Sequence, residues 1–177
     1  MKIVVLTGSP HRKGTSALLA DNFIAGAEAA GHQVYRFDAA FKQIHACTAC
    51  GTCKRTDTGC VFKDDEQELY PHVLAADAIV FISPVYFYSM SAQIKLAIDR
   101  LYAIDDALHG AKQCALLVTC EDDTLGATDG AVAIIKGMAA FFGWKLHGII
   151  TALACGNRAA IEKTSYPQDV FTLGKNF

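Results

Sequence analysis

The sequence predicts an α/β fold, in which five parallel strands form one doubly wound sheet of order 2-1-3-4-5 with helices on both faces. Three observations lead to this prediction. Strand-like and helix-like segments alternate along the chain. The strand-like segments are continuous apolar runs, which are typical of strands buried on both faces. The chain has 177 residues, 52% of them hydrophobic, so we expect residues 1–177 to form a single domain with a buried core.

The strands are expected where apolar residues follow one another without polar alternation. The first such run opens the chain, and it lacks the long hydrophobic region and the cleavage site of a signal peptide, so we interpret it as a strand. Ser83-Pro84 closes the third strand. The predicted strands span residues 2–7, 33–37, 78–83, 112–119 and 144–150.

The helices are expected where apolar residues recur at a spacing of three or four. In the first helix Leu19, Phe23 and Ala27 share one face, and Gly31 ends the helix. Right-handed crossover connections then place helices on both sides of the sheet. The predicted helices span residues 16–30, 64–76, 91–104, 130–142 and 159–173, and the last is interrupted near Pro167.

The charge and hydropathy of the chain exclude two classes of partner. The formal net charge is −2, so no basic bias indicates nucleic-acid binding, and no polybasic run indicates an anionic membrane. No apolar run approaches the roughly 18–20 residues of a membrane span. We therefore expect a cytoplasmic protein without nucleic-acid or membrane partners.

Residues 42–63 form a polar insertion without a clear period, and such long irregular loops usually carry function. The chain has 7 cysteines, an odd number that argues against a disulfide framework. Those within the insertion follow the spacing C-x2-C-x2-C-x6-C, which is too compact for the separated ligand pairs of most zinc sites. Thiolates select iron–sulfur clusters, zinc or copper(I), and a 4Fe-4S cluster takes one thiolate per iron. The candidate metal ligands are Cys47, Cys50, Cys53 and Cys60.

The loop after the first strand has the chemistry of a phosphate cradle. Its small residues permit close backbone approach, its hydroxyl groups can donate hydrogen bonds, and it leads into the N-terminus of a helix, where free N–H groups attract anions. The loop matches neither the Walker A nor the G-x-G-x-x-G pattern. The alternative is a plain capped loop, with Thr15 or Ser16 as the N-cap. The candidate binding residues are Ser9, His11, Arg12, Gly14, Thr15 and Ser16.

The loops after the third and fourth strands end at the same edge of the predicted sheet. Three successive aromatic residues, Tyr86 to Tyr88, need a partner, which could be a flat ring ligand, a subunit interface or the core. Acidic residues of the next loop would lie near such a ring, although a solvated turn also explains Asp122. The candidate ring-binding residues are Pro84, Val85, Tyr86, Phe87, Thr119, Cys120, Glu121 and Asp122.

These three regions together resemble the flavodoxin-like NAD(P)H-dependent FMN reductases, and specifically their iron–sulfur flavoprotein branch. The segment 8–14 is similar to the FMN phosphate loop of the family, and 83–87 is similar to its isoalloxazine loop. The cysteine spacing is similar to the compact cluster motif of the branch. Two positions depart from the family pattern, since His11 stands where arginine is common and Thr15 where asparagine is common.

The resemblance implies that the phosphate-loop residues hold FMN phosphate and that the second and third loops flank the flavin ring. It also implies that NAD(P)H is a possible co-substrate and that the protein forms a homodimer or homotetramer. Three functions remain open: electron transfer between a 4Fe-4S cluster and FMN, an NAD(P)H-dependent FMN or quinone reductase without a cluster, and a non-enzymatic electron carrier. In each, the electron donor or acceptor is a small molecule or a protein.

Overall fold

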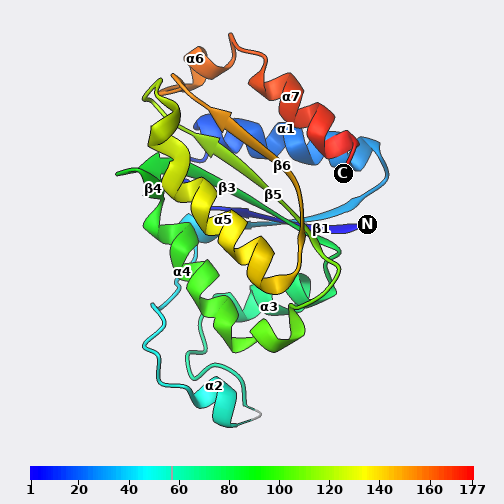
Figure 1. The fold of residues 1–177 in the computed structure, drawn as a ribbon, viewed down its shortest axis with the longest axis vertical. Coiled ribbons are helices and arrows are strands. Elements are labelled where there is room, and N and C mark those ends of the chain that lie inside the picture. The colour runs from blue at the N-terminus through cyan, green and yellow to red at the C-terminus, as the bar shows by residue number, and fades with distance from the viewer. Residues whose placement is uncertain (57) are drawn as a thin grey trace.

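The computed structural model describes residues 1–56 and 58–177, with only the backbone at residue 125. Its sheet has parallel strands in the order β2-β1-β3-β5-β6 (Figure 1). Counted along the chain, these parallel strands have the order 2-1-3-4-5, so the predicted fold class is confirmed. A short strand, β4, pairs antiparallel with the end of β3. The strand bounds are Lys2–Thr7, Gln33–Asp38, Ala78–Tyr86, Ser89–Met90, Gln113–Thr119 and Lys145–Ala152.

Helices cover both faces of the sheet because the parallel strands bury alternate residues on opposite sides. On β1, Ile3 and Val5 pack toward α1 and α7, while Val4 and Leu6 belong to a second cluster with α3, α4 and α5 (Figure 1). The helix bounds are Thr15–Ala29 (α1), Thr52–Arg55 (α2), Glu66–Ala75 (α3), Ala92–Arg100 (α4), Asp129–Phe142 (α5), Arg158–Ile161 (α6) and Tyr166–Lys175 (α7), with short 3-10 helices at Ala39–Phe41, Leu101–Ala103, Asp105–Ala107 and Leu125–Thr128.

The backbones of α1 and α7 lie close together, and this fixes the position of α1. A Cβ atom at Gly26 would lie 2.1 Å from the carbonyl oxygen of Phe171, and one at Gly174 would lie 2.3 Å from that of Phe23. Only glycine permits such an approach. The N-terminus of α1 is therefore held at the edge of the sheet where the strands end.

Several element boundaries differ from the prediction by a few residues, and two of the predicted boundaries involve proline. Ser83-Pro84 does not close the third strand, because β3 continues to Tyr86. The pairing with β1 ends opposite Ile82, so the missing N–H group of Pro84 falls where that neighbour has ended. At the C-terminus the predicted helix is interrupted, as expected, because residues 162–165 separate α6 from α7; Pro167 lies just after this break, in the first turn of α7, where no intrahelical N–H donor is needed.

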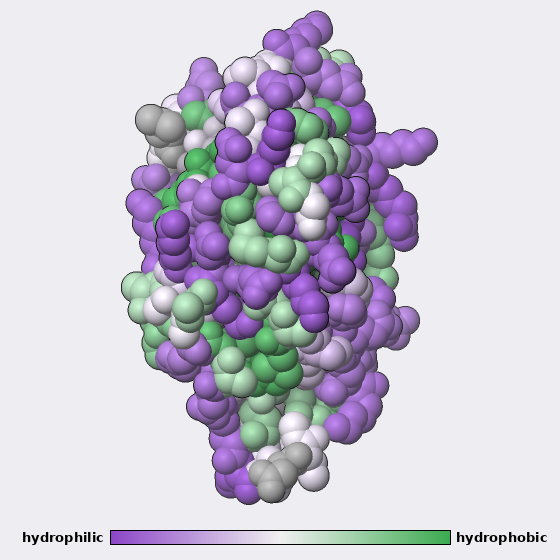
Figure 2. All heavy atoms as spheres, turned by 90° about the vertical axis from the view of Figure 1, so that its right-hand side faces the viewer, coloured by the Kyte–Doolittle hydropathy of each residue, from purple (hydrophilic) through white to green (hydrophobic). Residues whose placement is uncertain are grey.

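The predicted insertion at 42–63 extends away from the sheet beyond α4, and α2 is its only helix within the described residues (Figure 1). We call residues 42–63 the cysteine loop; its residue 57 lies outside the described residues. The opposite edge of the sheet, where the strands begin, faces the viewer in Figure 2 and is mostly hydrophilic. In the described parts of the chain, no helix has the length and apolar character needed to cross a membrane.

Candidate functional site

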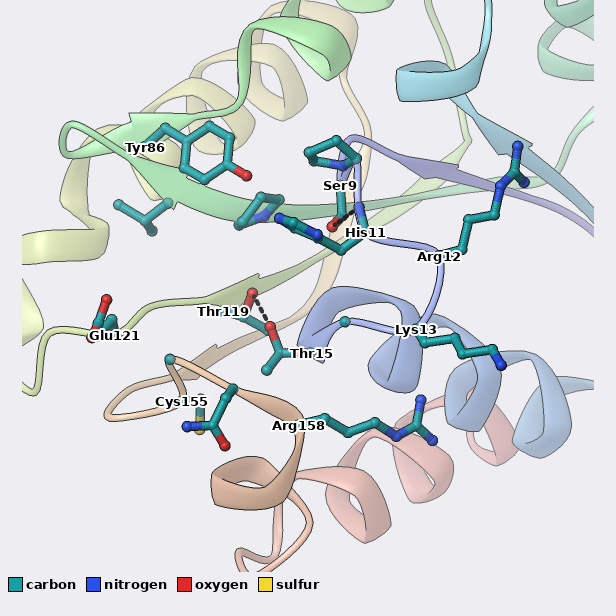
Figure 3. A pocket seen from close by; sticks show the side chains of 16 residues that line it. Ser9, His11, Arg12, Lys13, Thr15, Tyr86, Thr119, Glu121, Cys155 and Arg158 are labelled. Carbon is teal, nitrogen blue, oxygen red and sulfur yellow. Dashed lines mark hydrogen bonds between the residues drawn. The ribbon is translucent and has the colours of Figure 1, made fainter.

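A pocket of about 620 Å³ lies at the edge of the sheet where the parallel strands end (Figure 3). It is enclosed by the loops that follow β1, β3, β5 and β6. A second hollow of about 450 Å³ adjoins it and shares Val85 and Glu121 with it. Both volumes lie within the range of small-molecule and cofactor sites. In open α/β sheets, ligands bind at this edge, where the strand order reverses.

The loop after β1 forms a cradle at the start of α1. The backbone N–H of Gly14 donates to the carbonyl oxygen of His11 at 3.0 Å, and the Oγ of Ser9 accepts from the backbone N–H of His11 at 3.2 Å. The N-cap of α1 is Gly14, and no side chain caps the helix. The predicted alternative of a Thr15 or Ser16 cap is therefore wrong, and the first turn of a long helix faces the pocket with free N–H groups.

The hydroxyl groups next to this turn bond to β5 instead of capping the helix. The Oγ1 of Thr15 donates to the Oγ1 of Thr119 at 3.2 Å, and the Oγ of Ser16 lies 2.9 Å from the same atom. Thr15 and Thr119 line the pocket, whereas Ser16 is buried behind it. Ser16 thus holds α1 against β5, and the structure does not place it among the lining residues.

Positive charge gathers on the phosphate-loop side of the pocket. Lys13 and Arg158 extend in the same direction from opposite loops (Figure 3). Arg12 behaves differently, because its guanidinium group lies 3.6 Å from the ring centroid of Phe41 and points away from the pocket. This cation–π contact leaves Arg12 as part of the loop lining without directing its charge into the cavity. The other cations of the lining are Lys13 and Arg158, and the Nε of Arg158 also donates to the Oε1 of Glu162 at 2.8 Å.

The other side of the pocket is formed by β3 and its hairpin. Pro84, Val85 and Tyr86 line the pocket, and Tyr86 is 42% exposed. Phe87 and Tyr88 form the two-residue turn between β3 and β4, both with positive φ angles of 45° and 65°. Such a turn matches the twist of a hairpin but costs strain for residues other than glycine or asparagine. Phe87 is 100% exposed and lines only the adjoining hollow, where the predicted ring-binding residues Val85, Cys120, Glu121 and Asp122 also lie.

The loop after β5 is tied to the loop after β6 by backbone hydrogen bonds. Cys120 donates to the carbonyl of Ala152 at 2.9 Å and accepts from the N–H of Cys155 at 2.7 Å, while Ala154 donates to the carbonyl of Asp122 at 3.1 Å. The carboxylate of Asp122 accepts from the backbone and hydroxyl of Thr124, which lowers the pKa of Asp122. Glu121 lines both hollows, whereas Cys120 and Asp122 line only the smaller one.

Six lining residues were not among the sequence predictions. Four of them follow β6, and the rule that identified the loops after the other strands applies equally to this one. The Oδ1 of Asn157 accepts from the backbone N–H of Ala160 at 3.0 Å, so Asn157 caps α6 and its amide nitrogen stays available. The six residues are Pro10 and Lys13, which lie within the predicted phosphate-loop segment 8–14, and Cys155, Gly156, Asn157 and Arg158, which were missed.

The thiols of the cysteine loop gather around a separate small cavity of about 20 Å³, and Phe62 and Tyr102 complete its lining. Left-handed backbone conformations at Ala49, Gly51 and Gly59 bend the loop between the cysteines. This cavity shares no lining residue with the pocket at the sheet edge. The lining cysteines, all of them free thiols, are Cys47, Cys50, Cys53 and Cys60.

The electrostatics of the loop reflect how close these thiols lie to one another. Burial raises the pKa of Cys53, and the neighbouring Cys60 and Cys50 raise it further. Hydrogen bonds from the backbone and hydroxyl of Thr52 lower the pKa of Cys50. Within residues 1–56 and 58–177, no three histidine, cysteine or acidic side chains stand close enough together to hold a metal ion. Four thiolates are the ligands that an iron–sulfur cluster takes, so the residue types of the loop fit such a cluster. The positions of the four side chains are those of free thiols.

Comparison with known proteins places the chain among flavin reductases. Residues 1–142 match the family model described as NADPH-dependent FMN reductase. An iron–sulfur flavoprotein of Archaeoglobus fulgidus is 38% identical over 101 residues, which are 57% of this chain and 46% of that protein. One from Methanosarcina thermophila is 38% identical over 104 residues, covering 56% of this chain and 52% of that protein. The chain thus matches about half the length of these relatives.

The fold has relatives among solved structures. An NAD(P)H:quinone oxidoreductase from Methanothermobacter marburgensis superposes with a TM-score of 0.71 at 18% identity, covering 98% of this chain and 95% of that one. This likeness concerns the fold alone. The family model covers most of the sequence, including the loops after β1, β3 and β5 that enclose the pocket. The predicted resemblance is thereby confirmed at the level of the family: the chain belongs to the NADPH-dependent FMN reductase family.

Proposed function

We propose that this protein is an oxidoreductase that binds FMN in the pocket at the sheet edge. The uncapped first turn of α1 carries the proposal, because basic side chains line the pocket beside it and Tyr86, at the end of β3, lines the pocket on the other side. An anion is favoured at such a helix end, and a planar ring is favoured beside aromatic and apolar side chains. FMN has an anionic phosphate at one end and a planar ring at the other.

The residues of the pocket divide into those for the phosphate and those for the ring. Ser9, Gly14 and Thr15 would surround the phosphate, with charge supplied by Lys13 and Arg158. Pro84, Val85 and Tyr86 would support one side of the ring, and Glu121 would lie beyond its other end. When bound, FMN supplies the ability to accept either one or two electrons, which lets NAD(P)H serve as a two-electron donor. The protein contributes position, water exclusion and electrostatics.

We further propose that the cysteine loop holds a 4Fe-4S cluster, which would exchange single electrons with FMN. The four thiols already line one cavity, and the curated relatives that the chain matches are iron–sulfur flavoproteins. Because the cavity and the pocket share no residue, electron transfer between the two sites would run between separate parts of the fold or between subunits. A reductase without a cluster remains the second candidate, since the described side chains form no metal site.

Purification without oxygen, followed by FMN, iron and sulfide analysis, tests the proposal. The proposed function predicts about one FMN and about four irons per chain. A yellow protein without iron that oxidises NAD(P)H would support the cluster-free reductase. A yellow protein that contains no iron and does not oxidise NAD(P)H would support an electron carrier. A colourless preparation that cannot be reconstituted with FMN would overturn all three.

We propose that the protein assembles as a homodimer or homotetramer through the β3–β4 hairpin. Phe87 is 100% and Tyr88 is 64% exposed, and side chains of this size at a strained turn call for a covering surface. Light scattering after gel filtration should give the mass of two or four chains, and Phe87→Ser should shift it toward one. Phe141→Ser, at an exposed position on α5, serves as the control and should leave the mass unchanged. A monomeric wild-type protein would contradict the assembly.

The charge of Glu121 should lower the reduction potential of bound FMN. Glu121 lines both hollows, and a carboxylate near the ring disfavours an anionic reduced flavin. An exposed charge about 4 Å away contributes roughly 1 kcal/mol, so Glu121→Gln should raise the two-electron potential by about 20 mV. Asp122→Asn is the control, and it should shift the potential less because the carboxylate of Asp122 bonds to Thr124. An unchanged potential in Glu121→Gln would refute the effect; spectroelectrochemical titration measures it.

A further inference from the structure

Arg100 is the largest fully buried side chain in the described part of the protein, at 1% exposure. It belongs to the last turn of α4, directly beside the cysteine loop. A buried guanidinium is costly unless its charge and its N–H groups are matched. The hydrogen-bond partners of Arg100 therefore indicate its structural role.

These partners come from both ends of the cysteine loop. Near its start, the carbonyl oxygen of His45 accepts from the Nη1 of Arg100 at 2.9 Å. Directly after its end, the two carboxylate oxygens of Asp64 accept from Nη1 at 2.7 Å and from Nη2 at 3.1 Å. Asp64 also accepts from the backbone N–H of His45 at 2.9 Å. The two ends of the loop are thus joined to each other directly, by this bond and by two bonds between Gln43 and Asp65, and the guanidinium group of Arg100 ties both ends to α4.

One further contact and the ionisation of Asp64 support this arrangement. The guanidinium lies 5.2 Å from the ring centroid of Phe62, which lines the thiol cavity. Burial alone would raise the pKa of Asp64, but the hydrogen bonds from Arg100 and His45 hold it well below its usual range. The carboxylate therefore stays ionised at neutral pH, and the charged pair persists. A bidentate arginine–carboxylate pair has a defined geometry that a lysine cannot reproduce.

We propose that Arg100 is a positioning residue that closes the cysteine loop and thereby gathers its thiols around one cavity. Closing a long irregular segment costs conformational entropy, and a buried, geometrically fixed pair offsets that cost before any metal arrives. The use of the gathered thiols as cluster ligands rests on the proposed function, but closure of the loop does not depend on it.

Alkylation of the metal-free, reduced protein by iodoacetamide, mapped by mass spectrometry, tests this proposal. Cys53 and Cys60 are half-buried, Cys47 and Cys50 are exposed, and Cys114 is buried in the core. In Arg100→Met, labelling of Cys53 and Cys60 should accelerate at least about tenfold, because one partner of a buried pair has been removed. Cys114 should stay protected, which shows that the fold is intact.

The direction of the change separates positioning from a purely electrostatic role. Loss of positive charge alone would not speed the labelling of a thiol, because iodoacetamide reacts with the thiolate and cations favour thiolates in general. Faster labelling therefore reports an opened loop, and Arg100→Lys, which keeps the charge without the bidentate geometry, should also accelerate it. The control is Arg36→Lys, since the Nε of Arg36 donates to both carboxylate oxygens of Asp38 at 2.9 and 3.1 Å on β2, in a more exposed pair outside the cysteine loop. It should leave the labelling of all loop cysteines unchanged.

Unchanged or slower labelling of Cys53 and Cys60 in Arg100→Met, with Cys114 protected, would overturn the proposal. If Arg100→Met also exposes Cys114, the test rests on Arg100→Lys and Asp64→Asn instead. Faster labelling of Cys60 in both variants supports loop closure. Labelling of Cys60 at the wild-type rate in both variants overturns it. Iron and sulfide analysis of the wild-type protein is read separately. A wild-type protein without iron would remove the cluster from the proposed function. The labelling result would still test closure of the loop by Arg100, which does not depend on the cluster.

Discussion

Replacement of Gly14 by valine is expected to leave the protein folded but unable to retain FMN. Gly14 is the N-cap of α1, with φ −79° and ψ −173°, which any residue can adopt, so the backbone itself is not strained by the change. The constraint on a larger side chain is the space around residue 14. A Cβ atom there would lie 2.9 Å from the Cβ of His11, 3.3 Å from its carbonyl oxygen and 3.8 Å from the Oγ of Ser9. The added methyl groups would occupy the cradle proposed for the phosphate.

The expected loss of affinity is at least about 100-fold, because displacing the phosphate removes two or more charge-assisted hydrogen bonds worth roughly 1.5–3 kcal/mol each. Quenching of FMN fluorescence during titration of the apoprotein measures it. Gly137→Val on α5 is the control, since nothing lies within 4 Å of a Cβ at that position. A yellow Gly14→Val protein with wild-type affinity would show that the phosphate binds elsewhere.

Local patterns in the sequence predict the fold, but they do not predict the irregular ends of its helices and strands. Continuous apolar runs and helical spacing are sufficient to predict the parallel strands and their order. They do not predict the hairpin after β3, because its turn uses Phe87 and Tyr88 in left-handed conformations. Sequence rules for such turns look for glycine, asparagine or aspartate. A turn of two aromatic residues therefore gives no local signal.

The candidate site was predictable where it depends on which loop a residue belongs to. Three of the four pocket segments were predicted because they follow a strand and also carry phosphate- or ring-binding residue types; the loop after β6 was missed, although it too follows a strand. The direction of a side chain is a different matter. Arg12 turns toward Phe41, and Arg100 pairs with Asp64, 36 residues away. Such contacts are set by tertiary packing, which no spacing rule in one sequence reports.

Glu66 should make the stability of the protein fall as pH rises. Its side chain is fully buried in the first turn of α3, and neither carboxyl oxygen has a hydrogen-bond partner among the described residues. Burial raises the pKa of Glu66 from an ordinary value near 4.5 to about 8, against the lowering effect of Arg100. The nearby Asp64 raises it slightly more. At neutral pH the folded protein therefore carries a proton that the unfolded chain has released.

The sign follows from this difference in proton binding. Below about pH 4.5 both states are protonated, and above about pH 8 both are ionised, so the change is confined to the window between these values. Within it the folded state binds more protons, and the free energy of unfolding decreases with rising pH. Since one pKa unit corresponds to about 1.4 kcal/mol, and partial solvation reduces the effect, we expect a loss on the order of 3 kcal/mol across the window.

Glu66→Gln removes the titrating group while keeping the size of the side chain, so it should be close to wild-type stability at pH 5 and more stable by about 3 kcal/mol at pH 8, or roughly 6–12 °C in melting temperature. Urea unfolding of both proteins at several pH values measures the difference. The amide also lacks partners, but that penalty is the same at every pH and cannot produce the slope.

Glu68→Gln, exposed on the same helix and paired with Lys42, is the control and should change stability by less than about 1 kcal/mol throughout. A difference between Glu66→Gln and the wild type that stays constant from pH 5 to pH 8 would mean that the folded protein ionises Glu66 as readily as the unfolded chain does. In that case the charge of Arg100 would compensate for burial, and its role would extend beyond the pair with Asp64.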